Sequence, residues 1–448
     1  MVIFTGMSAT SRPSSTTRHK HQILTVQESL RSSVLHGSRS FGQRRRLLIV
    51  KFGGSSLSNP KRISLAVSSV AREYSRGNRV VVVVSAVGNT TDRLLHLTNG
   101  GAGLVETDKD DILAMGERTS ARIFAAALKS CGIQARYYDP SDRDWPIITD
   151  DNFLNANPLK TKCMQRIHRY LNPVLGDGVV PVIGGFIGRT RDGRISTLGR
   201  GGSDTTALLL AMALEADEVV LVTNVPGILS ADPALVRNAR VLPRIDMRTL
   251  TGMADTGTKF IHRKALRFKD PNINIRVISN TNGKLDSQGT LVTGVSIPDL
   301  EVTVNNPHPV ASVTIIGTGL PHQPELVQKI SKLAGQNLVA VSQDRDSAIL
   351  YVKQTEKLPQ QIARLHEAVL NDPHGIALAA RMGMALITVR SIGLEERPGV
   401  IARISESLRS ANINMFGVLT ITSSVLVFVD WKIRRKVAGL IRSSLERN

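Results

Sequence analysis

Residues 47–56, LLIVKFGGSS, are the most informative stretch of this sequence. The apolar run ends in Lys51, two glycines and two serines follow, and Asn59-Pro60 then begins a helix pattern. A strand that passes through glycines into a helix N-terminus is where α/β proteins hold phosphate, because backbone N–H groups and the helix dipole point at the anion. The stretch lacks the P-loop spacing G-x-x-x-x-G-K-[ST]. It therefore predicts either a different phosphate cradle or a plain strand–turn–helix joint.

The chain beyond this stretch alternates short Val- and Ile-rich runs with helical patterns, which predicts a mostly parallel sheet covered on both faces. Helices are expected at 60–74 and about 110–129, a loop at 85–92, and a hairpin turn at Asp192-Gly193. Strands are expected at 47–52, 79–84, 134–138, 179–186, 218–223 and 273–278. Ligands of such sheets bind at the carboxyl ends of the strands, where the Gly-rich loops fall.

The composition changes at residues 280–307, which are rich in Asn, Gly, Ser, Asp and Pro. Two similar strand–helix–strand patterns follow. The first has strands near 313 and at 348–352 with a helix at 324–334, and the second has strands near 387 and at 425–429 with a helix at 399–410. They predict a pair of small βαββαβ modules.

The composition excludes several classes of protein. Aromatic residues make up 4% of the chain, which argues against a surface that stacks single-stranded nucleic acid. The formal charge of +20 is partly local, because residues 1–46 contain eight Lys or Arg and one acid, Glu28. This segment is expected to be disordered, as either an organelle transit peptide or an over-extended start of a cytoplasmic protein. Cys131 and Cys163 are expected to be core thiols, and no apolar run is long enough to cross a membrane.

Four further loops carry polar residues to the same predicted edge of the sheet. Glu117 lies early in a long helix, and the loop TLGRGGSDTTA carries Arg200 and Asp204. Each residue also has an ordinary interpretation: Ser203 or Asp204 as a helix N-cap, Glu117 as a solvated acid, Arg200 as a surface charge. The glycines around Arg200 half-match the Rossmann fingerprint, but Asp204 replaces the third glycine and the next strand lacks the ribose-binding acid, so a nicotinamide site is rejected.

Together, the loops resemble those of the aspartate kinases. The segments KFGGSS, SAVGNTTD, MGER, GGFIG, TLGRGGSDTTA, TNVPGILSADP and GTKFIH occur in the order of that family, and EERPGVIARISESLRSANINMFG is similar to one of its tandem ACT modules. The resemblance implies a three-layer αβα amino-acid-kinase domain at 47–295 and ACT modules at 308–380 and 385–448. It also implies phosphorylation of the aspartate β-carboxylate by ATP with Mg²⁺, the first step towards lysine, threonine and methionine. Homo-oligomers formed through the ACT modules and a lysine or threonine effector are implied too, with no nucleic-acid or membrane partner.

The resemblance also assigns roles by position. Lys51 would stabilise the transferring phosphoryl group beside the Gly53 and Gly54 amides, and Asp204 would orient the lysine and organise the metal side. Arg200 would bind the aspartate α-carboxylate and Glu117 its α-ammonium. Residues expected to hydrogen-bond the substrate or phosphate are Ser55, Ser85 and Thr91. Residues expected to line the nucleotide pocket are Thr223, Asn224, Leu229, Asp232, Lys259 and Phe260.

Several positions depart from the family pattern. Ser55 replaces a usual Thr, Asn224 a usual Asp, Leu229 an aromatic or larger polar residue, and Arg263 a common Pro, which predicts altered nucleotide contacts. The first ACT copy has GLPHQPELVQKI where an acid followed by Pro-Gly is expected, so feedback by lysine or threonine stays open. Two alternatives also stay open: a related kinase that acts on another small carboxylate, and a non-catalytic ACT-containing regulatory subunit.

Overall fold

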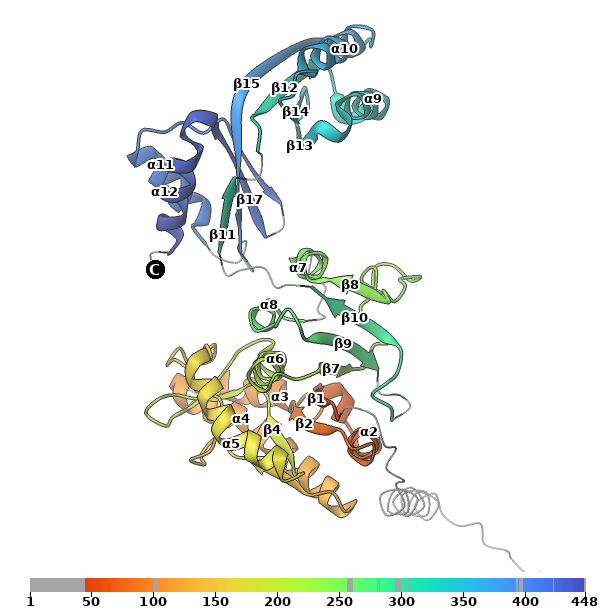
Figure 1. The fold of residues 1–448 in the computed structure, drawn as a ribbon, viewed down its shortest axis with the longest axis vertical. Helices are drawn as coiled ribbons and strands as arrows, with labels where there is room; N and C mark the ends of the chain where they lie inside the picture. Colours follow the sequence, from red (N-terminus) through yellow and green to blue (C-terminus); the bar gives the residue numbers. More distant parts are fainter. Residues whose placement is uncertain are drawn as a thin grey trace, which may run out of the picture. The chain divides into compact units, whose positions relative to one another are not determined.

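The computed structural model describes residues 45–99, 103–255, 261–279, 281, 283–294, 300–304, 307–391, 394, 398–421 and 423–446. The chain divides into two compact units, 1–250 with 258–296 and 251–257 with 297–448 (Figure 1). Most of the predicted disordered extension lies outside the described residues. Its last residue, Arg46, belongs to the first unit, because its carbonyl accepts a hydrogen bond from the Arg79 amide.

The first unit is built on an eight-stranded sheet in the order β3-β4-β2-β1-β7-β9-β10-β8. Its strands are β1 (Leu47–Phe52), β2 (Arg79–Val84), β3 (Ala135–Tyr138), β4 (Val180–Gly184), β7 (Glu218–Thr223), β8 (Arg244–Asp246), β9 (Asn274–Ser279) and β10 (Gly289–Thr293). Every neighbouring pair is parallel except β9 with β10. This confirms the predicted mostly parallel sheet. The hairpin at Asp192-Gly193 forms from β5 (Ile187–Arg189) and β6 (Ile195–Thr197).

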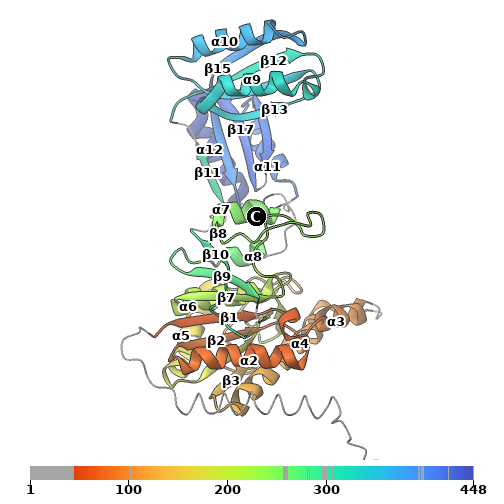
Figure 2. The same cartoon turned by 90° about the vertical axis from the view of Figure 1, so that its right-hand side faces the viewer.

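Helices cover both faces of this sheet. The helices along this part of the chain are α2 (Pro60–Ser75), α3 (Thr90–Asn99), α4 (Glu106–Ser130), α5 (Lys160–Gly176), α6 (Gly202–Leu214), α7 (Met247–Asp255) and α8 (Arg263–Leu266). The division between the two units falls within α7. α2 and α4 pack on one face against alternate residues of β1 and β2, such as Val50 and Val82 (Figure 2). α5 and α6 pack on the other, so the unit has three layers. Among the described helices, none is both long and apolar enough to cross a bilayer.

The start of α3 corrects the expected loop at 85–92. The helix begins at Thr90, whose hydroxyl donates to Val87 O over 2.6 Å, and the Arg93 amide donates to Asn89 O. Hydroxyl residues favour helix starts as well as turns, because their oxygens bond to nearby backbone groups.

The second unit is a continuous sheet with helices packed against it. Its strands are β11 (Glu301–Val304), β12 (Val310–Gly317), β13 (Leu338–Gln343), β14 (Ser347–Lys353), β15 (Gly375–Arg390), β16 (Gly417–Ile421) and β17 (Ser424–Asp430). The helices α9 (Pro324–Ala334) and α10 (Leu358–Leu370) pack against one half, and α11 (Val400–Ser410) and α12 (Arg434–Glu446) against the other. The long β15 serves both halves: its first part pairs with β12, and its second part with β17.

The strand β11 completes the second module. It pairs antiparallel with β15 from Glu301 opposite Arg390 to Val304 opposite Ile387. The sequence places β11 in the composition break, outside the ranges predicted for both modules. The second module therefore takes its fourth strand from a segment that precedes the first module, and Val302 of that strand is part of the second module's core.

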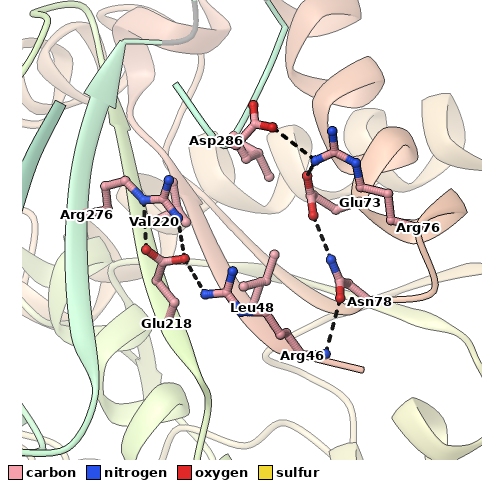
Figure 3. A pocket seen from close by; sticks show the side chains of 10 residues that line it. Arg46, Leu48, Glu73, Arg76, Asn78, Glu218, Val220, Arg276 and Asp286 are labelled. Carbon is pink, nitrogen blue, oxygen red and sulfur yellow. Dashed lines mark hydrogen bonds and ion pairs between the residues drawn. The ribbon is translucent and has the colours of Figure 1, made fainter. Parts of the chain in front are cut away.

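A cavity of about 440 Å³ lies at the amino ends of β1, β7 and β9 (Figure 3). Glu218, almost fully buried, accepts hydrogen bonds from Arg46 Nη2 and Arg276 Nε, both over 2.7 Å. Arg76 joins Glu73 of α2 to Asp286. These ion pairs tie strand ends to the end of α2. They lie at the sheet edge opposite the carboxyl ends, so we assign them a structural role.

Candidate active site

Lys51 and Asp204 form an ion pair at the carboxyl edge of the first sheet. Lys51 is near the end of β1, and Asp204 is in the first turn of α6. Lys51 Nζ lies 2.7 Å from Asp204 Oδ1, and the two side chains are 16% and 13% exposed. Because little water screens this pair, the carboxylate holds the ammonium firmly in one position.

The two glycines after β1 allow the chain to pass close to its neighbours. A Cβ on Gly54 would lie 2.7 Å from both Ala86 O and Gly88 O, a distance that real Cβ atoms do not show. A Cβ on Gly53 would lie 3.9 Å from Lys51 Nζ. The Gly53 amide donates to Val222 O over 3.1 Å, so in this conformation it joins β1 to β7 and is not free for phosphate.

Glu117 is a buried carboxylate with one unsatisfied oxygen. It is 3% exposed, so the interpretation as a solvated helix acid is wrong. Oε1 accepts a hydrogen bond from the Ala86 amide over 3.1 Å, while Oε2 is buried without a hydrogen-bond partner among the described residues. Burial raises its pKa to about 7, against the lowering effect of the Ala86 amide and the Thr91 hydroxyl. In its ionised form, a buried carboxylate with an oxygen left over is suited to a cationic group of a ligand.

Contacts between loop residues bring these groups to one edge. The Ser85 amide donates to Phe52 O at the end of β1, and Ser85 Oγ donates to Ser203 Oγ over 3.0 Å. Gly185, directly after β4, lies so close to Ser203 that a Cβ would be 2.7 Å from the serine Cβ. The ends of β1, β2 and β4 thus converge on the N-terminus of α6. Ser203 is not the N-cap, because α6 is preceded by Gly201 at φ 72°.

Arg200 extends from a loop between two glycines with positive φ, Gly199 at 69° and Gly201 at 72°. Its side chain is exposed and forms no hydrogen bond or ion pair with a described residue. A guanidinium on a well-defined loop with its donors unused is suited to a planar carboxylate. Ser55 lies beside this edge, where its carbonyl accepts from Arg62 Nη1 over 2.6 Å.

Two of the residues predicted for the nucleotide site, Thr223 and Asn224, line a cavity of about 270 Å³ beside β7 and β9. The sequence did not single out the rest of the lining, which is Ser56, Asn59, Lys61, Arg62, Leu65, Ser279 and Thr281. Lys61 and Arg62, near the start of α2, come soon after the glycines of the 47–56 stretch. This closeness in the sequence is the signal that could have identified them as part of the site.

The other predicted nucleotide residues lie elsewhere or are not described. Leu229 is 8% exposed and forms a bridge with Val241, and it does not line this cavity. Asp232 is exposed and accepts a hydrogen bond from the Ala234 amide. Lys259 and Phe260 lie outside the described residues.

Comparisons with known proteins indicate the family. Residues 46–279 match the model of the amino acid kinase family. The aspartokinase of Mycolicibacterium smegmatis is 31% identical over 423 residues, which cover 88% of this chain and 95% of the relative. An aspartokinase of Mycobacterium tuberculosis is 32% identical over 416 residues, with the same coverage of both.

Solved structures share the fold. The aspartate kinase from Synechocystis superposes with a TM-score of 0.72 at 24% identity, over 90% of this chain and 70% of that one. Aspartokinase III of E. coli, solved with aspartate and ADP, gives a TM-score of 0.51 at 21% identity, over 89% of this chain and 99% of that one.

Proposed function

The chain belongs to the aspartokinases of the amino acid kinase family, and on that premise we propose that it transfers the γ-phosphoryl group of ATP to the β-carboxylate of L-aspartate, giving 4-phospho-L-aspartate. The observation that carries this proposal is the Glu117 carboxylate, because its Oε2 is buried without a hydrogen-bond partner in the described part of the chain, at the same sheet edge as the Lys51–Asp204 pair. An amino-acid acceptor needs an anion for its ammonium close to the cation that binds phosphate. This edge provides both.

The reaction needs cations more than it needs a base. The β-carboxylate is ionised at pH 7, since its pKa is ~4, so no general base has to remove a proton. The barrier is the repulsion between this anion and the triphosphate, and fixed positive charge lowers it. Lys51, held by Asp204, supplies that charge at the transferring phosphoryl group.

The substrate backbone is recognised by opposite charges on two elements. Ionised Glu117 pairs with the α-ammonium, and the Arg200 guanidinium forms a two-pronged contact with the α-carboxylate. The hydroxyls of Ser85 and Thr91 lie on the same edge and complete the set of hydrogen bonds to aspartate or phosphate.

The nucleotide binds beside this edge, and Thr223 and Asn224 contact it from the end of β7. A magnesium ion that accompanies ATP would neutralise phosphate charge. Asp204 suits it, because Oδ1 is paired with Lys51 and one carboxylate oxygen remains, and Mg²⁺ is commonly held by one or two carboxylates together with phosphates and water.

The test is aspartyl phosphate formation, trapped as the hydroxamate, with the full chain. Lys51→Met and Asp204→Asn should each lower kcat by at least about 100-fold, because each disrupts the positioned charge. Lys162→Met, at an exposed position of α5, is the matched control and should leave the rate unchanged. A panel with glutamate and N-acetylated acids tests the alternative acceptor. Preference for any of these, or full activity of both site variants, would refute the proposal.

We also propose that the second unit mediates self-association. Residues 375–383 of β15 bond to β12 on one side, while the pairing with β17 begins only at Met384. This part of the strand therefore has an open edge among the described residues, with Ile376 59% and Met382 44% exposed. Sedimentation of the full chain tests this proposal, and a monomer at micromolar concentration contradicts it. Titration of lysine and threonine against activity tests whether either amino acid is an effector of this chain.

A further inference from the structure

The ammonium group of Lys264 in α8 is surrounded by oxygen acceptors. Nζ donates to Ala156 O and Leu198 O over 2.7 Å each, and it lies 3.1 Å from Asn155 O and 2.9 Å from Asn155 Oδ1. Three of these oxygens are backbone carbonyls from two segments distant in the sequence. A lysine uses three donors on a point charge, so it can join both segments to α8 at once.

These contacts hold the loop that carries Arg200. Leu198, whose carbonyl Lys264 binds, is two residues before Arg200. Asn155 packs on Gly199, where a Cβ would lie 2.6 Å from Asn155 Oδ1. On the other side, His262 packs on Gly201, where a Cβ would lie 2.0 Å from His262 Cβ. The loop is thus enclosed on both sides of Arg200.

We propose that Lys264 is a positioning residue for the amino-acid substrate: it fixes the 198–201 loop, and through that loop it sets where the Arg200 guanidinium meets the substrate α-carboxylate. This inference rests on the proposed function. A loop fixed before binding loses less conformational freedom when substrate arrives, so the effect appears in the affinity for aspartate.

The charge on Lys264 adds a pH dependence. Burial lowers the pKa of Lys264 to about 8, since desolvation outweighs the attraction of Asp150, and Arg267 lowers it further. Above pH 8 the amine has lost a donor and directs a lone pair at carbonyl oxygens, so the loop is held less firmly. The charged groups that act on Lys264 are Asp150 and Arg267. Further titratable or charged groups on the segments around α8 are Asp151, Arg200, Asp204 and His262.

Weaker anchoring of the loop above pH 8 does not lower the stability of the folded chain. The unfolded chain releases the Lys264 proton near 10.5 and the folded chain near 8, so between these pH values the unfolded state binds more protons. Stability from this group therefore rises with pH in that window while the loop loosens. Activity and stability are expected to move in opposite directions.

The test compares Lys264→Met and Lys264→Arg with the unaltered chain, and it uses Lys162→Met as control. In Lys264→Met the KM for aspartate should rise about 10-fold, while the KM for ATP stays within twofold. In the unaltered chain the KM for aspartate should rise several-fold from pH 7.5 to 9. Lys264→Arg stays charged at these pH values, so its KM for aspartate should be nearly flat over the same range.

A measurement without substrate separates this inference from the proposed function. Hydrogen–deuterium exchange of the peptide that contains residues 197–203 should be faster in Lys264→Met than in the unaltered chain and in Lys162→Met. If the chain forms no aspartyl hydroxamate but this exchange difference appears, the proposed reaction fails and the anchoring of the loop stands. Equal exchange, equal changes in both KM values, or the same pH profile in Lys264→Arg would overturn the inference. If Lys264→Met does not fold, the pH profile of Lys264→Arg decides: the same rise in the KM for aspartate as in the unaltered chain overturns the inference.

Discussion

Replacing Glu117 by glutamine should stabilise the substrate-free protein and weaken the binding of aspartate. The glutamine keeps the acceptor for the Ala86 amide but removes a charge that is buried without a full set of partners. The rise of the Glu117 pKa from 4.5 to about 7 means that ionisation of this group lowers the free energy of unfolding by about 3 kcal/mol.

The sign of this effect fixes its pH dependence. The folded state binds the Glu117 proton more tightly than the unfolded state, so the unaltered chain loses stability as pH rises from 4.5 through 7. Glutamine does not titrate. The free energy of unfolding of Glu117→Gln, relative to the unaltered chain, should therefore increase by about 2 kcal/mol between pH 5 and pH 8. Any constant cost of burying the amide cancels from this difference.

Tryptophan fluorescence can report the unfolding of the first unit alone. The chain has two tryptophans. Trp145 is fully buried in the first unit and Trp431 lies in the second, so Trp431→Phe leaves a single reporter of the relevant unfolding. Urea unfolding of both versions at pH 5 and pH 8 gives the four free energies. A stability difference that stays constant with pH would show that the pKa of Glu117 is not raised in the folded chain. In the same variant the KM for aspartate should rise about 10- to 100-fold, from the loss of a charge-assisted hydrogen bond.

Three further predictions concern packing, charge and recognition. Gly54→Ala should cost about 1–3 kcal/mol of stability and most of the activity, since its methyl group would meet Ala86 O at 2.7 Å; urea unfolding and the hydroxamate assay measure both. Glu218→Gln should destabilise the first unit by about 3 kcal/mol, because it leaves the Arg276 charge partly unpaired, with no change in either KM; thermal unfolding beside kinetics separates the two. Arg200→Lys should raise the KM for aspartate about 10-fold with kcat within threefold, since an ammonium cannot form the two-pronged contact, and steady-state kinetics checks it.

The fold of the first unit was predictable because its signals are local. The β-branched runs that end at Phe52 and Val84, and the helix that starts at Pro60 after the Asn59 cap, appear where the sequence predicts them. Two exceptions have different causes. The pairing of Leu229 with Val241 depends on a partner that periodicity does not reveal. The start of α3 at Thr90 has a local cause, because hydroxyl residues favour helix starts as well as turns.

The site was predictable in its residue types but not in its environment. The order of the motifs indicated Lys51, Asp204 and Glu117, and the structure brings them to one edge. Sequence alone left Glu117 open as a solvated acid, because burial of a helical residue depends on what packs over it. Lys264 gave no signal, since three of its four oxygen partners are main-chain carbonyls, which every residue has.

The placement of β11 sets the order in which the second unit can be completed during synthesis. This strand leaves the ribosome before the whole first module, yet its partner residues Ile387 to Arg390 are made more than eighty positions later. The first module can close within that interval, while the early strand waits unpaired. A fragment that begins after residue 304 would lack an edge of the second module, so truncations meant to isolate the second unit should start ahead of Glu301.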